Sequence, residues 1–490
     1  MLRRTACGAA LALTLTAPSA LAADWSPPVD AGLGEVVSLA LAPGGNLAIG
    51  YHERTLTGGQ NDRPRIASRT DGAPFASAPT ATSAGQVWTL SALADGSIRA
   101  HGLSAGRVWE ARRAAGSVSG FGTPQAITPA ESALTAFTIA FARNGAHTLG
   151  WRDTQRFLQT RFPDGGAEVP VDTQQHAAIG APRAVVADDG QAAATVTSNQ
   201  SFVHMVRSAG AGGEWGAPLA VNGTSPQLAM NARGDALLTW NEGALVKAAY
   251  RPAGGVFGAS VELGTNTLAV APPAIGPDGT GLVVFRRGGA GSDPLQAVEV
   301  RSTGVGRVQT IAPWQDGPAN ARVAIDARGD AFVVWGEPDG TASDLFARRA
   351  GRDLTFGDKE QLDGAGEDVA RGTIRLATDG TGEAAVAWSA NASPEPRVRV
   401  TELTSRYDPE PPPPDDDDDR DPPRDGGGPG PGPLPPAPPA PGPALPQPAT
   451  PRSGPIVPAQ ALTRLAVKRS GRRATVTFTL RTAGRVSLVL

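Results

Sequence analysis

A sequence repeat constrains this chain of 490 residues more than any other feature. Each copy has a short apolar segment, a turn that ends in glycine, and a second apolar segment. In the clearest copies an aromatic residue lies six positions after the glycine, as in Gly329 and Trp335. The equivalent glycines are Gly45, Gly96, Gly145, Gly190, Gly234, Gly279, Gly329 and Gly382, and they lie 51, 49, 45, 44, 45, 50 and 53 residues apart. So regular a period predicts a repeat architecture.

Each copy has the local pattern of β-structure. An Asp-Gly, Arg-Gly or Asn-Gly pair between two apolar runs favours a hairpin, because glycine adopts the positive φ of the turn. The run from Ala331 to Trp335 is wholly apolar, which is typical of a strand buried on both faces. A third strand follows, such as Leu245 to Arg251, and an aromatic-glycine pair such as Phe257-Gly258 precedes a fourth. Four strands per copy predict an all-β fold, an eight-bladed β-propeller over residues 23–407.

The two ends of the repeat region complement each other. The eighth copy ends with a third strand, Arg397 to Leu403, and lacks the aromatic-glycine strand. The N-terminal segment Trp25 to Val29 matches Trp215 to Leu219, which is the aromatic-glycine strand of another copy. It is therefore a candidate for the strand that the eighth copy lacks. We therefore expect the N-terminal strand to complete the last blade and so to protect its exposed edges. An open β-solenoid is the alternative, although a solenoid needs no displaced strand.

The repeat region resembles secreted bacterial β-propeller repeat proteins, sialidase-like and WD40-like in general architecture. The resemblance lies in the repeat pattern over about residues 23–406, and it implies a fold that hosts enzymes, lectins and scaffolds alike. The sialidase Asp-box has its aromatic residue three positions after glycine, whereas here the distance is six. None of the three tyrosines, Tyr51, Tyr250 and Tyr407, is in a convincing position for the nucleophile of a sialidase.

The N-terminus reads as a secretory signal peptide over residues 1–22. Arg3 and Arg4 precede a short apolar run, and Ala20-Leu21-Ala22 forms a cleavage signal. The run is too short for a good membrane span. The only cysteine, Cys7, lies in this segment, so the mature chain has no thiol for disulfides, zinc or catalysis. We expect a secreted or cell-surface protein with no membrane span in the mature chain shown.

The C-terminal part differs in composition from the repeats. Residues 408–460 are rich in Pro, Gly and Asp and include the acidic run Asp415 to Asp419; this predicts a disordered, extended linker. Residues 461–490 contain strand-like segments typical of an incomplete Ig-like or fibronectin-like β segment. Because two or three strands are not stable alone, we expect the sequence to be a fragment of a longer chain.

The sequence shows no catalytic constellation. It has no Gly-x-Ser-x-Gly, His-Glu-x-x-His or phosphate-loop motif. The five histidines show no close metal-ligand spacing, so we expect no metal and no cofactor. The formal net charge of −3 shows no overall excess of basic residues that would indicate binding of nucleic acid.

One set of polar residues remains as a candidate binding surface. Residues directly after the aromatic position differ between copies in charge and shape, so packing does not dictate them, and in a propeller they should surround one mouth of the channel. These residues are His52, Glu53, Arg152, Asp153, Asn241, Glu242, Arg286, Arg287 and Glu337. Their mixed charges suit a glycan or a cell-envelope protein, and ordinary solvated turns are the alternative.

Two functions are compatible with these sequence features. The first is a non-catalytic extracellular or cell-envelope binding or scaffold protein that presents a β-propeller on a flexible stalk. The alternative is an envelope-associated glycan hydrolase or lyase of sialidase-like architecture. The absence of a catalytic motif favours the first.

Overall fold

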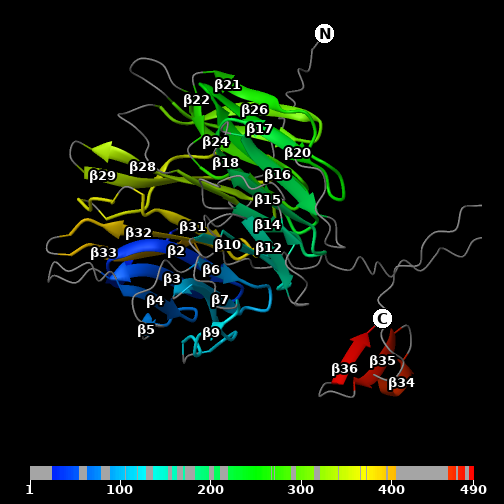
Figure 1. Ribbon diagram of the computed structural model, residues 1–490. Coiled ribbons are helices and arrows are strands. Elements are labelled where there is room, and N and C mark those ends of the chain that lie inside the picture. The colour runs from blue at the N-terminus through cyan, green and yellow to red at the C-terminus, as the bar shows by residue number, and fades with distance from the viewer. Residues whose placement is uncertain are drawn as a thin grey trace, which may run out of the picture. The chain divides into compact units, whose positions relative to one another are not determined.

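The computed structural model describes residues 25–403 and 462–489, apart from 54–62, 79–88, 105, 118–119, 129–135, 153–156, 163–168, 171–182, 198–202, 210–218, 266, 270, 288–293, 314–320, 340–341, 365, 371, 393–394, 471–472 and 481–484. The chain divides into two compact units, residues 1–410 and 411–490. The described residues form β-structure (Figure 1), and none of them belongs to a helix long and apolar enough to cross a membrane. The predicted signal peptide and linker lie outside the described residues.

The first unit contains, within its described residues, eight antiparallel sheets, which we number in chain order. Sheets 1 to 4 consist of β2 (Glu35–Ala42), β3 (Asn46–Glu53), β4 (Arg63–Arg69), β5 (Ala76–Ala78); β6 (Thr89–Ala92), β7 (Ile98–Ser104), β8 (Arg107–Arg113), β9 (Gln125–Ala126); β10 (Ala136–Phe141), β11 (His147–Arg152), β12 (Phe157–Phe162), β13 (Val169–Pro170); and β14 (Arg183–Val186), β15 (Ala192–Thr197), β16 (Val203–Ala209), β17 (Leu219–Asn222).

Sheets 5 to 8 follow the same plan, with one interrupted strand in sheet 6 and one N-terminal strand in sheet 8. They consist of β18 (Thr224–Met230), β19 (Ala236–Glu242), β20 (Leu245–Arg251), β21 (Val261–Thr265); β22 (Thr267–Ala269), β23 (Ala274–Ile275), β24 (Gly281–Arg287), β25 (Leu295–Arg301), β26 (Gly304–Ala312); β27 (Arg322–Ile325), β28 (Ala331–Asp339), β29 (Ala342–Ala350), β30 (Glu360–Gln361); and β31 (Arg375–Thr378), β32 (Ala384–Ala390), β33 (Arg397–Leu403), β1 (Val29–Leu33).

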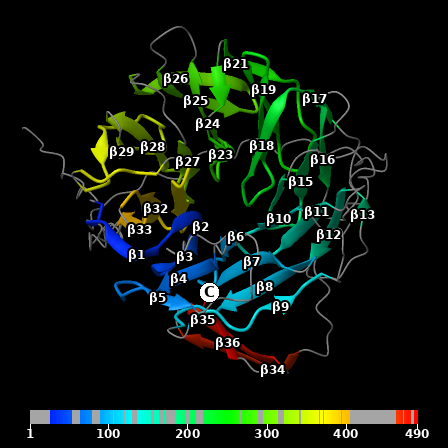
Figure 2. The same ribbon diagram turned by 60° about the vertical axis from the view of Figure 1, so that its left-hand side comes forward.

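The sheets radiate from a common centre. Figure 2 shows first strands such as β2, β6, β10, β18 and β27 near the centre and outer strands such as β5, β9, β13, β21 and β26 at the periphery. Each first strand contacts the first strand of the next sheet, and β31 of sheet 8 contacts β2 of sheet 1. This radial order of antiparallel sheets is a β-propeller architecture.

The N-terminal strand lies in sheet 8, beside the last strand of the unit. Val29 pairs with Val400 in an antiparallel register, and Trp25 forms a bridge with Leu403. The Asp30 carboxylate accepts hydrogen bonds from Arg397 at 3.1 Å and from Arg399 at 2.8 Å. This is the pairing that the sequence predicts between the two ends of the repeat region.

The first strand of sheet 6 is interrupted, which the repeat pattern did not predict. Both β22 and β23 pair with β24, and Pro272 and Pro273 lie between them. Proline has no N–H to donate to a neighbouring strand, so two successive prolines interrupt the ladder. Sheet 6 therefore has the plan of the other sheets with its first strand in two pieces.

The eight repeat glycines adopt the backbone conformation that the hairpin prediction requires. Their φ angles lie between 69° and 103°. In the turn of sheet 7, Gly329 N–H donates to Asp326 C=O at 3.1 Å, and Asp326 N–H donates to Asp330 C=O at 2.9 Å. Only glycine adopts this region without strain from a Cβ atom.

Gly190→Ala tests this turn. The φ of Gly190 is 83°, and no atom lies within 4 Å of the position that a Cβ would occupy. The expected loss of unfolding free energy is therefore backbone strain alone, about 1–2 kcal/mol, measured by denaturant unfolding. Gly258→Ala is the control: its φ is not positive, and its Cβ would lie 3.6 Å from the Tyr250 carbonyl oxygen, an ordinary contact. Equal losses in the two variants would contradict the turn assignment.

The predicted aromatic positions belong to the core. Trp335 and Trp388 are 0% exposed, Phe285 is 1% exposed, and Tyr51 and Trp240 are 4% exposed. The equivalent Trp151 side chain lies outside the described residues. Second strands such as β19 and β32 are buried on both faces because each sheet packs between two others.

The described residues of the second unit form a three-stranded antiparallel sheet in the order β34–β35–β36. Its strands are β34 (Leu462–Ser470), β35 (Arg473–Leu480) and β36 (Arg485–Val489). Membership of an Ig-like or fibronectin-like domain stays a prediction.

Candidate functional site

The two ends of the central channel are distinguished by the connections that lie there. We call the end with the glycine turns, which join first and second strands, the turn end, and the opposite end the loop end. His52 pairs with Glu35, Asn241 with Thr224, and Arg286 with Leu268, so each lies beside the start of a first strand. The predicted residues of the described second strands therefore lie at the loop end.

The structure does not bring the predicted acids together. Glu53 forms an ion pair with Arg65 at 2.8 Å, and Glu242 forms one with Lys247 at 2.9 Å. Glu337 accepts hydrogen bonds from Lys359 Nζ and from Trp335 Nε1, both at 2.8 Å. Each of these partners belongs to the same sheet as its acid or to the loop that follows that sheet's third strand.

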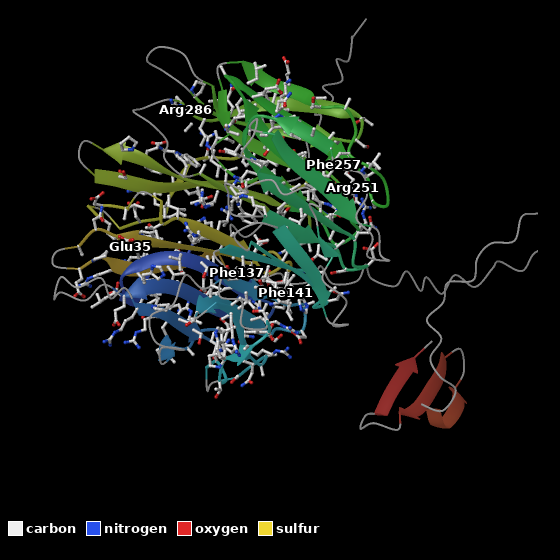
Figure 3. The ribbon with its side chains drawn as sticks, in the orientation of Figure 1. Glu35, Phe137, Phe141, Arg251, Phe257 and Arg286 are labelled. Carbon is white, nitrogen blue, oxygen red and sulfur yellow. The ribbon has the colours of Figure 1, made fainter. Side chains whose placement is uncertain are left out.

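The other predicted residues are described in part. Asn241 is buried, with 7% exposure. His52 and Arg286, the second of which Figure 3 labels, are partly buried. The side chains of Arg152 and Arg287 and the whole of Asp153 lie outside the described residues.

The turn end of the channel contains a ring of mostly apolar side chains. A cavity of about 260 Å³ lies there. Among its lining residues, one from each sheet lies four positions before the repeat glycine: Leu41, Ala92, Phe141, Val186, Met230, Ile275, Ile325 and Thr378. We call this set the apolar collar; Phe141 is labelled in Figure 3.

Hydrogen bonds between sheets use many polar groups of the turn end. Arg143 Nη2 of sheet 3 donates to Asp379 C=O of sheet 8 at 2.7 Å, although these sheets are not sequential neighbours. Ala94 N–H donates to Arg143 C=O at 2.7 Å, and Asn231 Nδ2 donates to Gly276 C=O at 2.8 Å. The turn end thus binds the sheets to one another, and fewer of its polar groups are left for a ligand.

The first strands carry a different set of residues toward the loop end. Seven positions before each repeat glycine lie Ser38, Thr89, Thr138, Arg183, Gln227, Pro272, Arg322 and Arg375. We call this set the polar layer, because every member except Pro272 is polar. Three members are arginines and none is a carboxylate. Thr89 and Arg183 are exposed to solvent.

The three arginines begin β14, β27 and β31. Backbone carbonyls hold two of them: Arg375 Nε donates to Val37 C=O at 2.7 Å, and Arg322 Nη1 donates to Ala321 C=O at 2.9 Å. Among the described ion pairs, none joins Arg183, Arg322 or Arg375 to an acid.

The three charges act on one another. Burial lowers the pKa of Arg322, and the charge of Arg183 lowers it further. Burial and the charge of Arg322 lower the pKa of Arg375 to about 10. Arg183 belongs to sheet 4 and Arg322 to sheet 7, with two sheets between them in chain order, so this repulsion acts across the channel. The three arginines occupy equivalent positions on sheets 4, 7 and 8, and the charges of neighbouring members act on Arg322 and Arg375.

Sequence reasoning missed this cluster, although a signal was present. The prediction rested on the positions after the aromatic residue, where the copies vary. Alignment of the copies on the repeat glycine shows arginine three times at the position seven residues earlier and no acid there.

A second polar cluster lies between sheets 2 and 3. His101 Nε2 lies 2.9 Å from Glu110 Oε2, and Arg99 Nη1 lies 3.2 Å from the same oxygen. Burial opposes the charge of Glu110, but hydrogen bonds from His101 and Arg112 outweigh it and lower the Glu110 pKa to about 2. His101 is 0% exposed. The hydrogen bonds keep Glu110 ionised, which a buried carboxylate needs for stability, although His101 Nδ1 is buried without a partner among the described residues.

The described residues contain no group of three or more His, Cys, Asp or Glu that could hold a metal ion.

Comparison with known proteins gives no family. No family model and no curated protein matches the chain. Among solved structures, an ulvan lyase of a new polysaccharide lyase family is similar, with a TM-score of 0.44 and 12% identity over 76% of this chain and 95% of that chain. The polysaccharide lyase Uly1 gives 0.41 and 10% over 77% and 91%. A putative TolB from Agrobacterium tumefaciens gives 0.31 and 14% over 58% and 95%. Likenesses this distant assign no activity to the chain.

Proposed function

We propose that this chain is an exported, non-catalytic binding protein: an eight-bladed β-propeller, presented on a proline-rich stalk, that binds a polar extracellular ligand at the loop end of its channel. The ligand is a glycan or a cell-envelope protein. The predicted signal peptide supports export, and the eight equivalent sheets support the number of blades.

The contrast between the two ends of the channel is the observation that favours this function most. The turn end has an apolar collar and turns that bond to one another. The loop end has the polar layer and loops that differ from sheet to sheet. Binding groups usually lie on loops held by a rigid frame, so the loop end is the better candidate surface.

A glycan array and a panel of envelope proteins, probed with residues 23–490, test this proposal. For the strongest ligand, the affinity of Arg286→Ala/Arg287→Ala is compared with that of Arg328→Ala/Asp330→Ala at the turn end. Loss of charge-assisted hydrogen bonds at the loop end should weaken binding about tenfold or more, while the turn-end variant should bind like the wild type.

The same samples are assayed for new reducing ends and for unsaturated uronate products. Binding without either product supports a binding protein. Ligand turnover would favour the hydrolase or lyase alternative. Equal loss of affinity in the two variants, or loss only in the turn-end variant, would contradict the placement of the site.

A further inference from the structure

We infer that Arg183, Arg322 and Arg375 form an oxyanion site in the channel, which takes a carboxylate or sulfate group of the ligand. This inference rests on the proposed function, because it specifies the chemistry that the loop end recognises. It places the recognition of charge on the first strands, inside the rim of predicted residues.

The first support is the equivalence of the three positions. Each arginine lies seven residues before its repeat glycine and is the first residue of a first strand. Regular strands hold the backbone of all three, so their separation is determined by the frame and not by a loop. Sheets 7 and 8 are adjacent, and β27 contacts β31, whereas Arg183 begins the first strand of sheet 4 and acts electrostatically on Arg322.

The second support is the state of the guanidinium groups. Arg375 donates to the carbonyls of Val37, Gly372 and Ile374, which orients it, while Arg322 donates to one carbonyl. Carbonyl oxygens bring no full negative charge, so the positive charges are hydrogen-bonded but not neutralised. An anion between them would relieve their repulsion, and guanidinium forks match the geometry of carboxylate and sulfate oxygens.

The third support is unpaired polar atoms in the same layer. Among the described residues, Ser38 Oγ and Gln227 Oε1 are buried and have no hydrogen-bond partner. A buried polar atom without a partner costs free energy, so this layer has hydrogen-bonding capacity that the described residues leave unused. Ser38 follows Val37, whose carbonyl binds Arg375, so the serine hydroxyl lies in the chain segment that contacts the arginine cluster.

The acids of the loop end do not remove the positive charge. Glu53, Glu242 and Glu337 are paired with Arg65, Lys247 and Lys359. The arginine cluster therefore has a net positive charge, which the low-dielectric walls of a channel focus toward its opening.

The test uses residues 23–490 and named probes: inorganic sulfate, glucuronate oligosaccharides, dextran sulfate and neutral dextran, all at constant ionic strength. The key variant is Arg322→Gln/Arg375→Gln. Its charge-matched control is Arg301→Gln/Arg307→Gln, on the outer strands of sheet 6, where both arginines are exposed. A third variant, Arg322→Lys/Arg375→Lys, retains the charge without the fork.

Sulfate should raise the melting temperature of the wild type and of the control more than that of the Gln variant, because binding stabilises only the protein that retains the site. Affinity for the most strongly bound charged probe should fall about 10- to 100-fold in the Gln variant and less in the Lys variant. Neutral dextran should show no difference between variants.

Three results would overturn the inference. Equal loss in the Gln variant and the control would mean general electrostatic attraction, and an unchanged Gln variant would mean that the arginines bind no anion. If Arg286→Ala/Arg287→Ala nevertheless weakens ligand binding, the proposed function stands while the oxyanion site fails. A sulfate effect without binding of any charged glycan would show a site for a free inorganic anion, contrary to the inference.

Discussion

Trp335→Ala is expected to lower the free energy of unfolding by about 3–5 kcal/mol. The Trp335 side chain is 0% exposed and packs in one cluster with Leu282 and Val284 of sheet 6. Truncation leaves a cavity between two sheets that the rigid frame cannot fill, and it leaves Glu337 without the Nε1–H that donates at 2.8 Å. Chemical denaturation measures the loss.

Val256→Ala is the control for this variant, because Val256 is 77% exposed and should change stability by less than about 0.5 kcal/mol. A Trp335→Ala protein that unfolds like the wild type would mean that the aromatic residues of the repeat do not hold neighbouring sheets together. The same test applies to Trp388, which is equally buried in sheet 8.

Removal of the N-terminal strand is expected to have a still larger effect. A chain that begins at Glu35 loses β1, the Trp25 bridge to Leu403 and both bonds of Asp30. It also exposes β33 as an edge that pairs with other chains. Because a domain is stable by only about 5–15 kcal/mol, we expect this chain to be insoluble or unfolded when expressed.

A milder variant tests the same strand in a folded protein. Val29 and Val400 are Cα partners, so Val29→Cys/Val400→Cys should form a disulfide on oxidation and raise the melting temperature. Cys7 is the only native cysteine. Val29→Cys/Val256→Cys is the control and should stay reduced. Free thiols in both proteins after oxidation would mean that β1 does not lie beside β33.

The repeat made much of the fold predictable. Gly329 and its equivalents predicted the hairpins correctly, because a positive φ depends on the local sequence of the chain. Trp335 and its equivalents predicted that the second strands are buried, because a strand that is apolar on both faces is stable only when other sheets cover both faces. The pairing of the N-terminal strand with sheet 8 was predictable because the eighth copy has no fourth strand after Leu403. In sheet 6, Pro272 and Pro273 were present in the sequence, but the repeat pattern alone gave no reason to expect a strand in two pieces.

The candidate site was less predictable, because it depends on which residues of different sheets approach one another. The loop end was predicted for His52, Asn241 and Arg286, and each lies there. Variation between copies directed attention to the second strands, whereas Arg322 and Arg375 begin first strands. Arg183 and Arg322 belong to sheets 4 and 7, and no local sequence pattern shows that the charge of one acts on the other.

The most direct measurement is a crystal structure of residues 23–490 soaked in bromide, with anomalous diffraction to locate the ion. We predict eight sheets around one channel and an anomalous peak between the guanidinium groups of Arg183, Arg322 and Arg375, which vanishes in Arg322→Gln/Arg375→Gln. Guanidinium groups that point away from the channel, or bromide bound only elsewhere, would contradict the oxyanion site.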